Sequence, residues 1–592
     1  MQNFTVRNER EQQPRKKHGC LWTICIFILL YVGMCAWMGY MMGGMFSAPA
    51  TKLEANSVYK LKLSGTLVEQ GQENNPFAAL LNYNPYYNQD ETVGLDNLLD
   101  NIRLAKTDDR ILGIYLEGGS LSMAPASAKT LRDALLDFKT SGKWIIAYAS
   151  NYGQTNYYVA SVADKIYLNP TATIDWNGLS AQKMYYTRLM DKLGIEMQIL
   201  KVGTFKSAVE PYFRTSMSDA DRLQTQQYLT GIWDEMKTAV SESRHIGVEQ
   251  LDQYADLYMG LQPQEKYIEY GFADTLLYVQ DMDSVLRLYS GTEDYNLLST
   301  NSLTSVVRTP SKAKNKVAVV YAEGEITDNS GSGIVGTDMV KTFKKIAKDD
   351  DVKAVVLRVN SPGGSADASE QIWHAIQTLK QKGLPVVVSM GDYAASGGYY
   401  ISCGADYIFA EPTTLTGSIG IFGTVPDMSK ILDKAGLDID GVGTNAHSDL
   451  QTNMVYKGMN KDEFQMMQTM VERGYDLFTR RCANGRGMTQ DAIKAIGEGR
   501  VWLGKDALKI GLVDSLGNIN NAVEKAVALA ELDSYQLAYY PETTDPMEEL
   551  LSMFDNTTDE ERLLMKVREF ASKPRVMALM PEVKIQEPVI FC

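Results

Sequence analysis

The sequence has few of the residues from which metal sites and disulfide frameworks are built. Its 592 residues include only four histidines and six cysteines. The histidines are far apart and form no HExxH motif, the usual helical signature of zinc. Three cysteines lie in one apolar stretch and three are scattered, so no pair has metal-ligand spacing. We therefore predict no metal site, no disulfide framework and no bound cofactor.

Basic residues are also too few for a nucleic-acid-binding surface. The 58 lysines and arginines are outnumbered by 73 aspartates and glutamates, which gives a net charge of −15. No zinc-finger, RNA-binding or basic-helix pattern is present, so we predict no nucleic-acid partner. A content of 45% hydrophobic and 22% charged residues is typical of globular proteins, and the length indicates several domains.

One long stretch carries no charge at all. Residues 21–46 form a run of 26 without a charged side chain, more than the ~20 that an α-helix needs to cross a bilayer. Basic residues at 15–17 precede it, so the positive-inside rule places residues 1–20 in the cytoplasm and the chain after the run outside. A cleaved signal peptide is the alternative, because residues 46–50 are mostly small. The length of the run favours an uncleaved membrane anchor.

Most of the rest of the sequence consists of two copies of one repeat unit. The segment "DKLGIE" at 191–196 matches "DKAGLD" at 433–438. These segments are separated by 242 positions, and so are Asp164 and Asp406. A constant offset over this distance indicates a nearly gapless internal repeat.

Each copy alternates predicted strands with predicted helices. In the second copy, "KVAVVYAEGEI" and "VKAVVLRVN" are continuous apolar strands, and "SADASEQIWHAIQTLKQKG" is an amphipathic helix. This alternation predicts an α/β fold with mostly parallel sheets flanked by helices. The predicted segments are a cytoplasmic segment (1–20), a transmembrane anchor (21–46), a first repeat (55–300), a linker (301–315), a second repeat (316–540) and a tail (541–592).

Two segments depart from the repeat pattern. An insert at 72–90 is rich in aromatic residues and asparagine, and it is either a membrane-facing or assembly loop or an ordinary packed loop. The tail at 541–592 begins with acidic residues and is a candidate for an oligomer contact.

Two turns of the second repeat carry residues suited to acyl transfer. One strand ends in "SPGGSADASEQ", where Gly363 and Gly364 allow backbone N–H groups to point outward, as an oxyanion hole requires. The next strand ends in "GDYAASGGYY", which places Ser396 and Gly397 where the strand gives way to a helix. Sites in parallel sheets lie at the carboxyl ends of strands, so both turns should meet at one edge. Taken alone, the first turn fits an ordinary strand–helix connection better than an oxyanion hole, and a serine in the position of Ser396 is often only a helix cap.

The first repeat lacks this serine, since Gln154 stands 242 positions before Ser396. A serine nucleophile needs a general base. His374 lies in the middle of a predicted helix and His447 in a polar loop, so both are poor candidates. A buried lysine is the other option, because desolvation favours its neutral form.

Lys206, in "ILKVGTFKSAVEPYF", is the favoured lysine because small and apolar residues flank it, and Lys201 is the competing base. The residue 242 positions after Lys206 is Ser448. The first repeat thus has the lysine without the serine, and the second has the serine without the lysine. This arithmetic leaves two hypotheses open, a shared Ser396–Lys206 site or two structural copies.

Five segments resemble those of one protease family over nearly the whole chain. They are "TFKSAVEPYFR", "NSPGGSADASE", "YAASGGYYISCGAD", "TLTGSIGIFG" and "GRVWLGKDALKIGLVD". On these motifs the chain resembles the long, duplicated form of the signal peptide peptidase A (protease IV) family, peptidase family S49, of Gram-negative bacteria. The resemblance implies tandem crotonase/ClpP-like domains and a membrane-anchored serine protease. Its implied substrates are cleaved signal peptides and other short or unfolded peptides.

The resemblance also implies an assembly, a location and site residues. It implies a homotetramer in the bacterial inner membrane, single-pass, with the catalytic domains in the periplasm. The implied site residues are Ser396 as nucleophile, Lys206 as general base, Ser418 as a serine that helps to orient the lysine, and Gly363, Gly364 and Gly397 in the oxyanion region.

Two alternatives belong to other functional classes. A crotonase-type fold also processes acyl-CoA thioesters with paired backbone N–H groups, but it then needs a site for the phosphates of CoA. A membrane-anchored assembly scaffold, in which Ser396 only caps a helix, would have no activity. The predicted anchor and the division of serine and lysine between the repeats favour the protease.

Overall fold

The computed structural model describes residues 53–71, 92–307, 313–329, 331 and 333–542. The predicted anchor (21–46), the insert (72–90) and the tail beyond residue 542 lie outside the described residues. In the described part of the chain, no helix is both long and apolar enough to span a bilayer.

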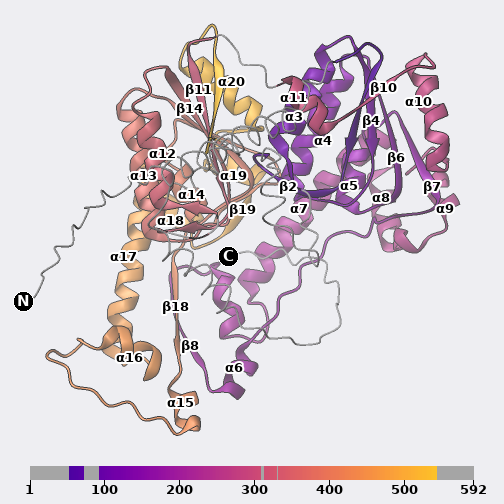
Figure 1. The fold of residues 1–592 in the computed structure, drawn as a ribbon. Helices are drawn as coiled ribbons and strands as arrows, with labels where there is room; N and C mark the ends of the chain where they lie inside the picture. Colours follow the sequence, from indigo (N-terminus) through magenta and orange to yellow (C-terminus); the bar gives the residue numbers. More distant parts are fainter. Residues whose placement is uncertain (1–52, 72–91, 308–312, 330, 332, 543–592) are drawn as a thin grey trace, which may run out of the picture. The chain divides into compact units, whose positions relative to one another are not determined.

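The first repeat contains a six-stranded sheet in which every neighbouring pair is parallel (Figure 1). The order of its strands is β10-β1-β4-β6-β7-β9. The central strands are apolar and buried, as expected for a parallel sheet covered on both faces. The strands are β1 (Ser57–Lys62), β4 (Ile111–Glu117), β6 (Trp144–Tyr152), β7 (Lys165–Ile174), β9 (Thr275–Leu276) and β10 (Asn296–Ser299).

The second repeat contains an eight-stranded sheet with the main order β19-β17-β15-β14-β11-β21; β16 branches from β15, and β20 pairs with β16. Its pairs are parallel except β17 with β19. The strands are β11 (Lys316–Glu323), β14 (Val352–Ser361), β15 (Val386–Ala395), β16 (Tyr407–Ala410), β17 (Leu415–Gly417), β19 (Val501–Leu503), β20 (Ser515–Leu516) and β21 (Gln536–Tyr540).

Alternate side chains of β11 enter two cores, which shows that both faces of the second sheet are covered. Ala318, Val320 and Ala322 pack with residues of α12 (Gly336–Ile346) and α13 (Ala366–Gln381). Val317, Val319 and Tyr321 pack with residues of α20 (Ile519–Leu529) on the opposite face. The period of two residues along a strand produces this division. The mixed α/β architecture with mostly parallel, helix-flanked sheets is as the sequence predicts.

Paired helices reproduce the repeat that the sequence predicts. Helices α7 (Asp219–Arg244) and α17 (Lys461–Arg486) both have 26 residues, and their first residues are 242 positions apart. Helices α6 (Thr187–Leu193) and α15 (Ser429–Ala435) have the same offset and each end in a left-handed glycine. Further helices are α3 (Leu95–Thr107), α4 (Pro125–Lys139), α5 (Gln154–Ala160), α8 (Val248–Asp256), α9 (Gln264–Glu269), α10 (Met282–Ser290), α14 (Gly397–Ser402), α16 (Leu450–Tyr456), α18 (Gln490–Ile496) and α19 (Gly504–Lys509).

The same ion pair recurs in both copies. Arg244, at the end of α7, lies 3.1 Å from the carboxylate of Asp274, and Arg486, at the end of α17, lies 2.6 Å from that of Asp514. Equivalent contacts at equivalent positions support a true duplication of the fold. Helix α11 (Thr300–Val307) occupies the first part of the predicted linker and packs on α3.

One small antiparallel sheet joins the two repeats. Strand β8 (Glu196–Lys201) of the first repeat pairs with β18 (Phe422–Asp427) of the second, with Lys201 opposite Phe422. The two strands run side by side away from the large sheets (Figure 1). The chain that leaves β8 is therefore held against the second repeat, and Lys206 lies five residues beyond this strand.

Candidate active site

Ser396 occupies the corner between β15 and α14, as predicted. It is the residue before the first turn of α14, and its backbone has φ 53° and ψ −116°. A positive φ is unusual for a residue with a side chain and stores backbone strain. The corner is held by the N–H of Ser396, which donates to the carbonyl of Gly417 at 3.0 Å. Such a corner is typical of a serine nucleophile at the carboxyl end of a strand.

Lys206 reaches this serine from the other repeat. Its side chain is buried, with only 2% of the residue exposed. Its Nζ donates to Ser396 Oγ at 3.0 Å, to Ser418 Oγ at 2.9 Å and to the Ser418 carbonyl at 3.3 Å. The structure therefore brings together three of the predicted site residues within one chain. A lysine amine in contact with a serine hydroxyl has the geometry of a general base and its nucleophile.

The lysine is enclosed by glycines that the sequence reasoning did not single out. A Cβ atom on Gly499, which has φ +74°, would lie 2.6 Å from Cβ of Lys206. One on Gly420 would lie 3.4 Å from its Cδ atom. The preceding residue, Phe205, donates its N–H to the Glu498 carbonyl at 2.9 Å. Gly499 is the first residue of the segment "GRVWLGKDALKIGLVD", one of the motifs that carry the family resemblance. The residues next to a glycine in the sequence do not show which distant residue it packs against.

The predicted glycines surround the serine on its other side. A Cβ on Gly363 would lie 2.8 Å from both the Gly397 nitrogen and the Ser396 Cβ, and one on Gly397 would lie 3.2 Å from the Gly364 nitrogen. The backbone nitrogens of Gly364 and Gly397 are thus neighbours beside Ser396. The N–H of Gly363 instead donates to Ser361 Oγ at 3.1 Å. Two adjacent backbone donors near a serine can stabilise an oxyanion.

The other candidate bases lie elsewhere. His374, on α13, and His447, in the loop before α16, are both exposed, as expected from the sequence. The amine of Lys201 lies 5.5 Å from the centre of the Phe213 ring. Ser448, the counterpart of Lys206, is exposed in a loop. In the turn after Gly364, the Ser365 hydroxyl caps α13 by accepting from Ala368 N at 3.2 Å.

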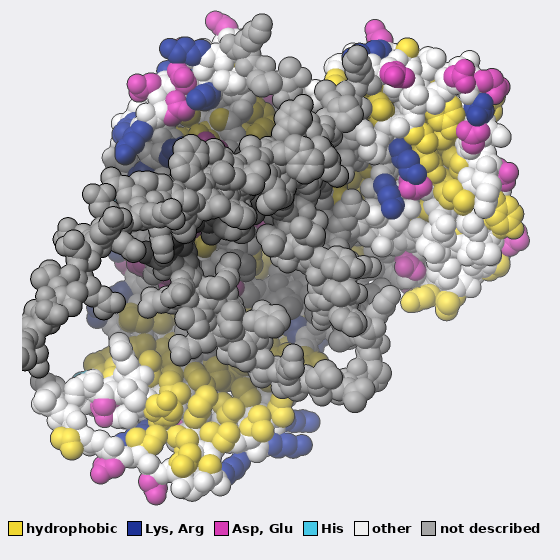
Figure 2. All heavy atoms as spheres, in the orientation of Figure 1, with side chains coloured by type: hydrophobic (Ala, Val, Ile, Leu, Met, Phe, Trp, Pro, Cys, Tyr) yellow, Lys and Arg dark blue, Asp and Glu magenta, His cyan; other side chains and the backbone are white. Residues whose placement is uncertain are grey.

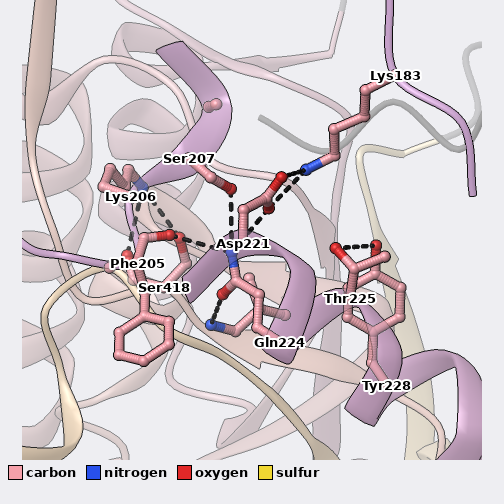
Figure 3. Close-up of a pocket in the computed structure, with 12 residues that line it drawn as sticks. Lys183, Phe205, Lys206, Ser207, Asp221, Gln224, Thr225, Tyr228 and Ser418 are labelled. Atoms are coloured by element: carbon pink, nitrogen blue, oxygen red, sulfur yellow. Dashed lines mark hydrogen bonds and ion pairs between the residues drawn. The ribbon is translucent and has the colours of Figure 1, made fainter. Parts of the chain in front are cut away.

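A cavity of about 30 Å³ adjoins the lysine (Figure 3). Lys206 and Ser418 line it together with polar side chains of α7, and it has room for water. Asp221 on α7 is fully buried, and both of its carboxylate oxygens accept from Lys183 Nζ at 2.7 Å. Burial raises the pKa of Tyr228, which therefore lines the cavity as a neutral phenol.

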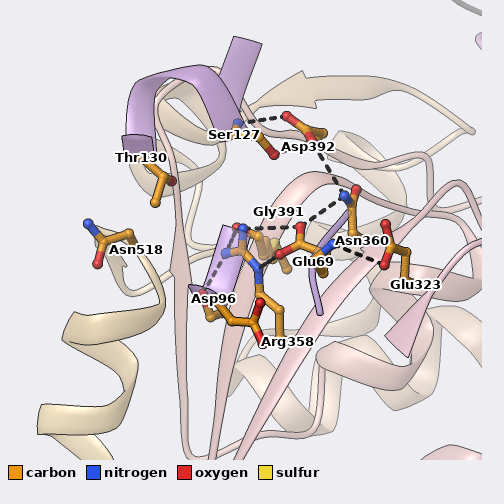
Figure 4. Close-up of polar contacts among 12 residues, drawn as sticks. Glu69, Asp96, Ser127, Thr130, Glu323, Arg358, Asn360, Gly391, Asp392 and Asn518 are labelled. Carbon is orange, nitrogen blue, oxygen red and sulfur yellow. Dashed lines mark hydrogen bonds and ion pairs between the residues drawn. The ribbon is translucent and has the colours of Figure 1, made fainter. Parts of the chain in front are cut away.

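Buried polar side chains fix one repeat against the other (Figure 4). Arg358 of β14 bonds through Nε and Nη2 to both carboxylate oxygens of Glu69, at 2.8 and 3.2 Å. Asn360 donates to Glu69 at 2.9 Å and to Asp392 at 3.3 Å, and Asp392 accepts from the N–H and hydroxyl of Ser127. These residues and Glu323 form what we call the junction network. Glu69 and Ser127 belong to the first repeat and the others to the second.

The junction network contains more acidic than basic side chains. Burial, with the nearby charge of Glu69, raises the pKa of Glu323 to about 7, although the N–H of Glu69 donates to its carboxylate at 3.1 Å. Burial also raises the pKa of Glu411, whose Oε1 accepts from the Thr130 hydroxyl at 2.7 Å. Because the network holds the repeats in register, it also supports the meeting of Lys206 with Ser396.

Comparisons with known proteins match both repeats to the same family. The family model of peptidase family S49 matches residues 137–288 and 378–533, once in each repeat. The family model of Clp protease matches residues 311–415. The chain is similar to Protease 4 of Salmonella typhi, with 36% identity over 529 residues that cover 87% of this chain and 84% of that one.

Two further relatives are similar to most of this chain. Protease 4 of Haemophilus influenzae is 35% identical over 524 residues, which cover 85% of this chain and 83% of that protein. A chloroplastic serine protease SPPA of Arabidopsis thaliana is 28% identical over 452 residues, which cover 74% and 66%.

Proposed function

The chain belongs to peptidase family S49 and is a serine protease, and from this premise we propose that it is a membrane-anchored endopeptidase that uses Ser396 and Lys206 as a catalytic dyad. The observation that carries the proposal is the 3.0 Å hydrogen bond between Lys206 Nζ and Ser396 Oγ. The base comes from the first repeat (55–300) and the nucleophile from the second (316–540).

In the acylation step, the neutral amine of Lys206 accepts the hydroxyl proton of Ser396 while the oxygen attacks a peptide carbonyl. Burial of the lysine favours this neutral form, because an ammonium group loses solvation in the protein interior. The hydroxyl of Ser418, 2.9 Å from Nζ, orients the amine. The N–H groups of Gly364 and Gly397 stabilise the negative oxygen, and Gly363 allows the close approach of the two turns.

The remaining steps return the dyad to its starting state. The Lys206 ammonium protonates the leaving amine, so the C–N bond breaks and an acyl-Ser396 ester remains. A water molecule then gives a proton to Lys206 and attacks the ester. The proton passes to the Ser396 oxygen as the acid product leaves. Protons balance within the turnover, and no metal or cofactor takes part.

The proposed substrates are cleaved signal peptides and other short or unfolded peptides. The apolar run at 21–46 would anchor the enzyme in the bacterial inner membrane by a single pass, with residues 1–20 in the cytoplasm and both repeats in the periplasm. Signal peptides are released at this membrane, so the anchor would hold the site close to its substrate.

The proposed enzyme acts as a homotetramer. Hydrophobic side chains gather on the surface where Figure 1 places α6 and α15 (Figure 2). Leu189 and Leu193 of α6 are exposed there, and so is Leu437 beyond α15. Apolar surfaces of this kind commonly mark contacts between proteins, which supports contact between copies of the chain.

The dyad is tested by replacing each member, with one lysine and one serine outside the dyad as controls. With a fluorogenic signal-peptide substrate, Ser396→Ala and Lys206→Met should each lower kcat by roughly 10⁴-fold or more while the thermal midpoint is retained. Lys201→Met and Ser448→Ala are the controls, and both should keep wild-type kcat. Substantial turnover by Ser396→Ala, or loss of turnover in Lys201→Met alone, would overturn the assignment.

The pH profile and a covalent probe test the chemistry. A lysine base predicts activity that rises toward mildly alkaline pH, whereas a histidine base would give a midpoint near ~6.5. A fluorophosphonate should label the wild type at Ser396 and leave Ser396→Ala unlabelled. A protein that hydrolyses acyl thioesters but no peptide would instead be a crotonase-type enzyme, and one that is never labelled would be a scaffold.

A further inference from the structure

Glutamine is an uncommon residue to find buried within a helix, as Gln224 is. It lies on α7 with 4% of its surface exposed, among the polar side chains that line the cavity beside Lys206 (Figure 3). Its counterpart 242 positions later, Met466 on α17, is 43% exposed. The helix itself therefore does not require an amide here, and the reason must lie in what the amide contacts.

The nitrogen of this amide holds the residues on both sides of the lysine. Gln224 Nε2 donates to the Phe205 carbonyl at 3.1 Å and to Ser207 Oγ at 3.0 Å. It also lies 3.3 Å from Asp221 Oδ1. Two bonds that flank Lys206 fix the direction in which its side chain leaves the backbone.

The oxygen of the same amide accepts a hydrogen bond from the second repeat. Gln224 Oε1 accepts the N–H of Val501, the first residue of β19, at 3.2 Å. Strand β19 pairs with β17, where Val501 lies opposite Gly417. The carbonyl of Gly417 accepts the N–H of Ser396, so one amide links the lysine loop to the strand pair that carries the serine.

We infer that Gln224 is a positioning residue that sets the distance between Lys206 Nζ and Ser396 Oγ by clamping the lysine loop to β19. This inference rests on the proposed dyad. Gln224 contacts neither the serine nor the amine in the hydrogen bonds described above, so it acts through the backbone. Gln224 also forms hydrogen bonds to both repeats. Because Lys206 and Ser396 are far apart in the sequence, neighbouring residues of the chain cannot align them, and a contact between the repeats is needed.

The test replaces the amide without changing the length of the side chain. Gln224→Met, in the full-length protein with a fluorogenic peptide, should lower kcat by about 10- to 100-fold and change KM by less than about threefold, because misplacement of a catalytic group acts on the chemical step. The rate of fluorophosphonate labelling at Ser396 should fall in parallel.

A matched glutamine on the same helix provides the control. Gln227 accepts from Arg500 Nη2 at 2.7 Å in an exposed contact, so Gln227→Met should keep kcat within about twofold. If Ser396→Ala removes activity but Gln224→Met equals the wild type, the positioning role is wrong and the dyad stands. If Ser396→Ala remains active, the dyad itself is wrong.

The pH profile separates positioning from solvation. The titratable groups that line the cavity are Lys183, Asp221, Tyr228 and Lys206. Gln224→Met keeps the cavity filled, so its profile should match that of the wild type. Gln224→Ala admits water next to Lys206, which favours the ammonium form, so its profile should also move to higher pH. A shift in the Met variant as large as in the Ala variant would overturn the positioning role.

A smaller substitution keeps the inference testable if Gln224→Met does not fold. Ser207→Ala removes one of the two acceptors next to Lys206 and leaves the rest of the helix contact intact. We expect a severalfold lower kcat with the thermal midpoint retained. Wild-type kcat in Ser207→Ala would overturn the inference.

Discussion

The strand–helix junction occurs twice in this molecule, and its two copies differ in backbone as well as in side chain. In the first repeat, Gln154, the counterpart of Ser396, is already the first residue of α5 and does not have a positive φ, and Gly153 before it has φ −69° and ψ 155°, an ordinary extended conformation. In the second repeat, α14 begins after Ser396, which has φ 53°. The strained corner is therefore a property of the copy that holds the serine, not of the repeat as such.

The two side chains also use equivalent segments differently. Gln154 Oε1 accepts from the N–H groups of Asn177 and Gly178 at 2.9 and 3.0 Å, and its Nε2 donates to the Gly178 carbonyl at 3.2 Å. The counterpart of Gly178, 242 positions later, is Gly420, which leaves room for Lys206. In the first copy, the backbone of this segment is thus hydrogen-bonded by Gln154 of the same repeat. In the second copy, the equivalent glycine leaves space that Lys206 of the other repeat occupies.

The largest effect, a loss of kcat, is expected from a change at Gly499, which packs against Lys206 in the second repeat. Gly499→Ala would place a Cβ atom 2.6 Å from Cβ of Lys206, against a backbone that cannot move without shifting the base. We expect kcat to fall by about 100-fold or more, because small displacements of a catalytic group are costly. Steady-state kinetics on the folded variant measure this change.

A second left-handed glycine separates displacement of the lysine from backbone strain. Gly487, at the end of α17, has φ +63° and open space around it. Gly487→Ala should destabilise the protein by roughly 1 kcal/mol through its backbone alone and leave kcat unchanged. Equal losses of kcat in the two variants would contradict the proposed packing role of Gly499.

A smaller, pH-dependent effect is expected where the repeats meet. The pKa of Glu323 is raised to about 7 in the folded protein, so the stability that its protonated form provides is complete below about pH 4.5 and is lost as pH rises through 7. The glutamine in Glu323→Gln cannot ionise. The free energy of unfolding of this variant should therefore exceed that of the wild type by an amount that grows as pH rises through 7, to the order of 2 kcal/mol above pH 8. Denaturant unfolding at several pH values measures this difference.

An exposed neighbour is the matched control for this titration. Glu325 lies two residues further along the same connection and faces solvent. Glu325→Gln should show a constant difference from the wild type between pH 5 and 9. A parallel pH dependence in both variants would rule out the buried contact with Glu69 as the cause.

The smallest effect is expected in the copy without the serine. Gln154→Ser removes three partly buried hydrogen bonds of the first repeat and should cost about 1 to 2 kcal/mol of stability. It should create no activity, since the backbone of this copy lacks the strained corner. Fluorophosphonate labelling of the double variant Gln154→Ser/Ser396→Ala tests this, and a labelled first repeat would show that a hydroxyl alone suffices.

Much of the fold was predictable because its signals are local. The apolar runs that form β11 and β14 and the offset of 242 positions are visible in the sequence, and so is the serine after β15. The offset also pointed to Lys206, since the lysine was missing from one copy as the serine was from the other. The contact of Lys206 with Ser396, 190 positions away, is only a hypothesis from the sequence, and in the structure Nζ and Oγ lie 3.0 Å apart.

The rest depends on contacts between segments that are distant in sequence. A constant offset shows which positions are equivalent, but not which face of one repeat meets the other. Glu69 and Arg358 are 289 positions apart, and neither lies in a motif that indicates a partner. The same holds for Gln224 and Val501, and for the pairing of β8 with β18. Tertiary packing alone selects these pairs.

The division of the site between the repeats has a consequence for biosynthesis. The ribosome makes Lys206 first and Ser396 190 residues later, and it makes Gly499 and Val501, which hold the lysine loop, later still. Under the proposed mechanism, a nascent chain has no aligned dyad until nearly the whole second repeat has emerged. The order of the two residues along the chain would then delay proteolysis until synthesis of the protein is nearly complete.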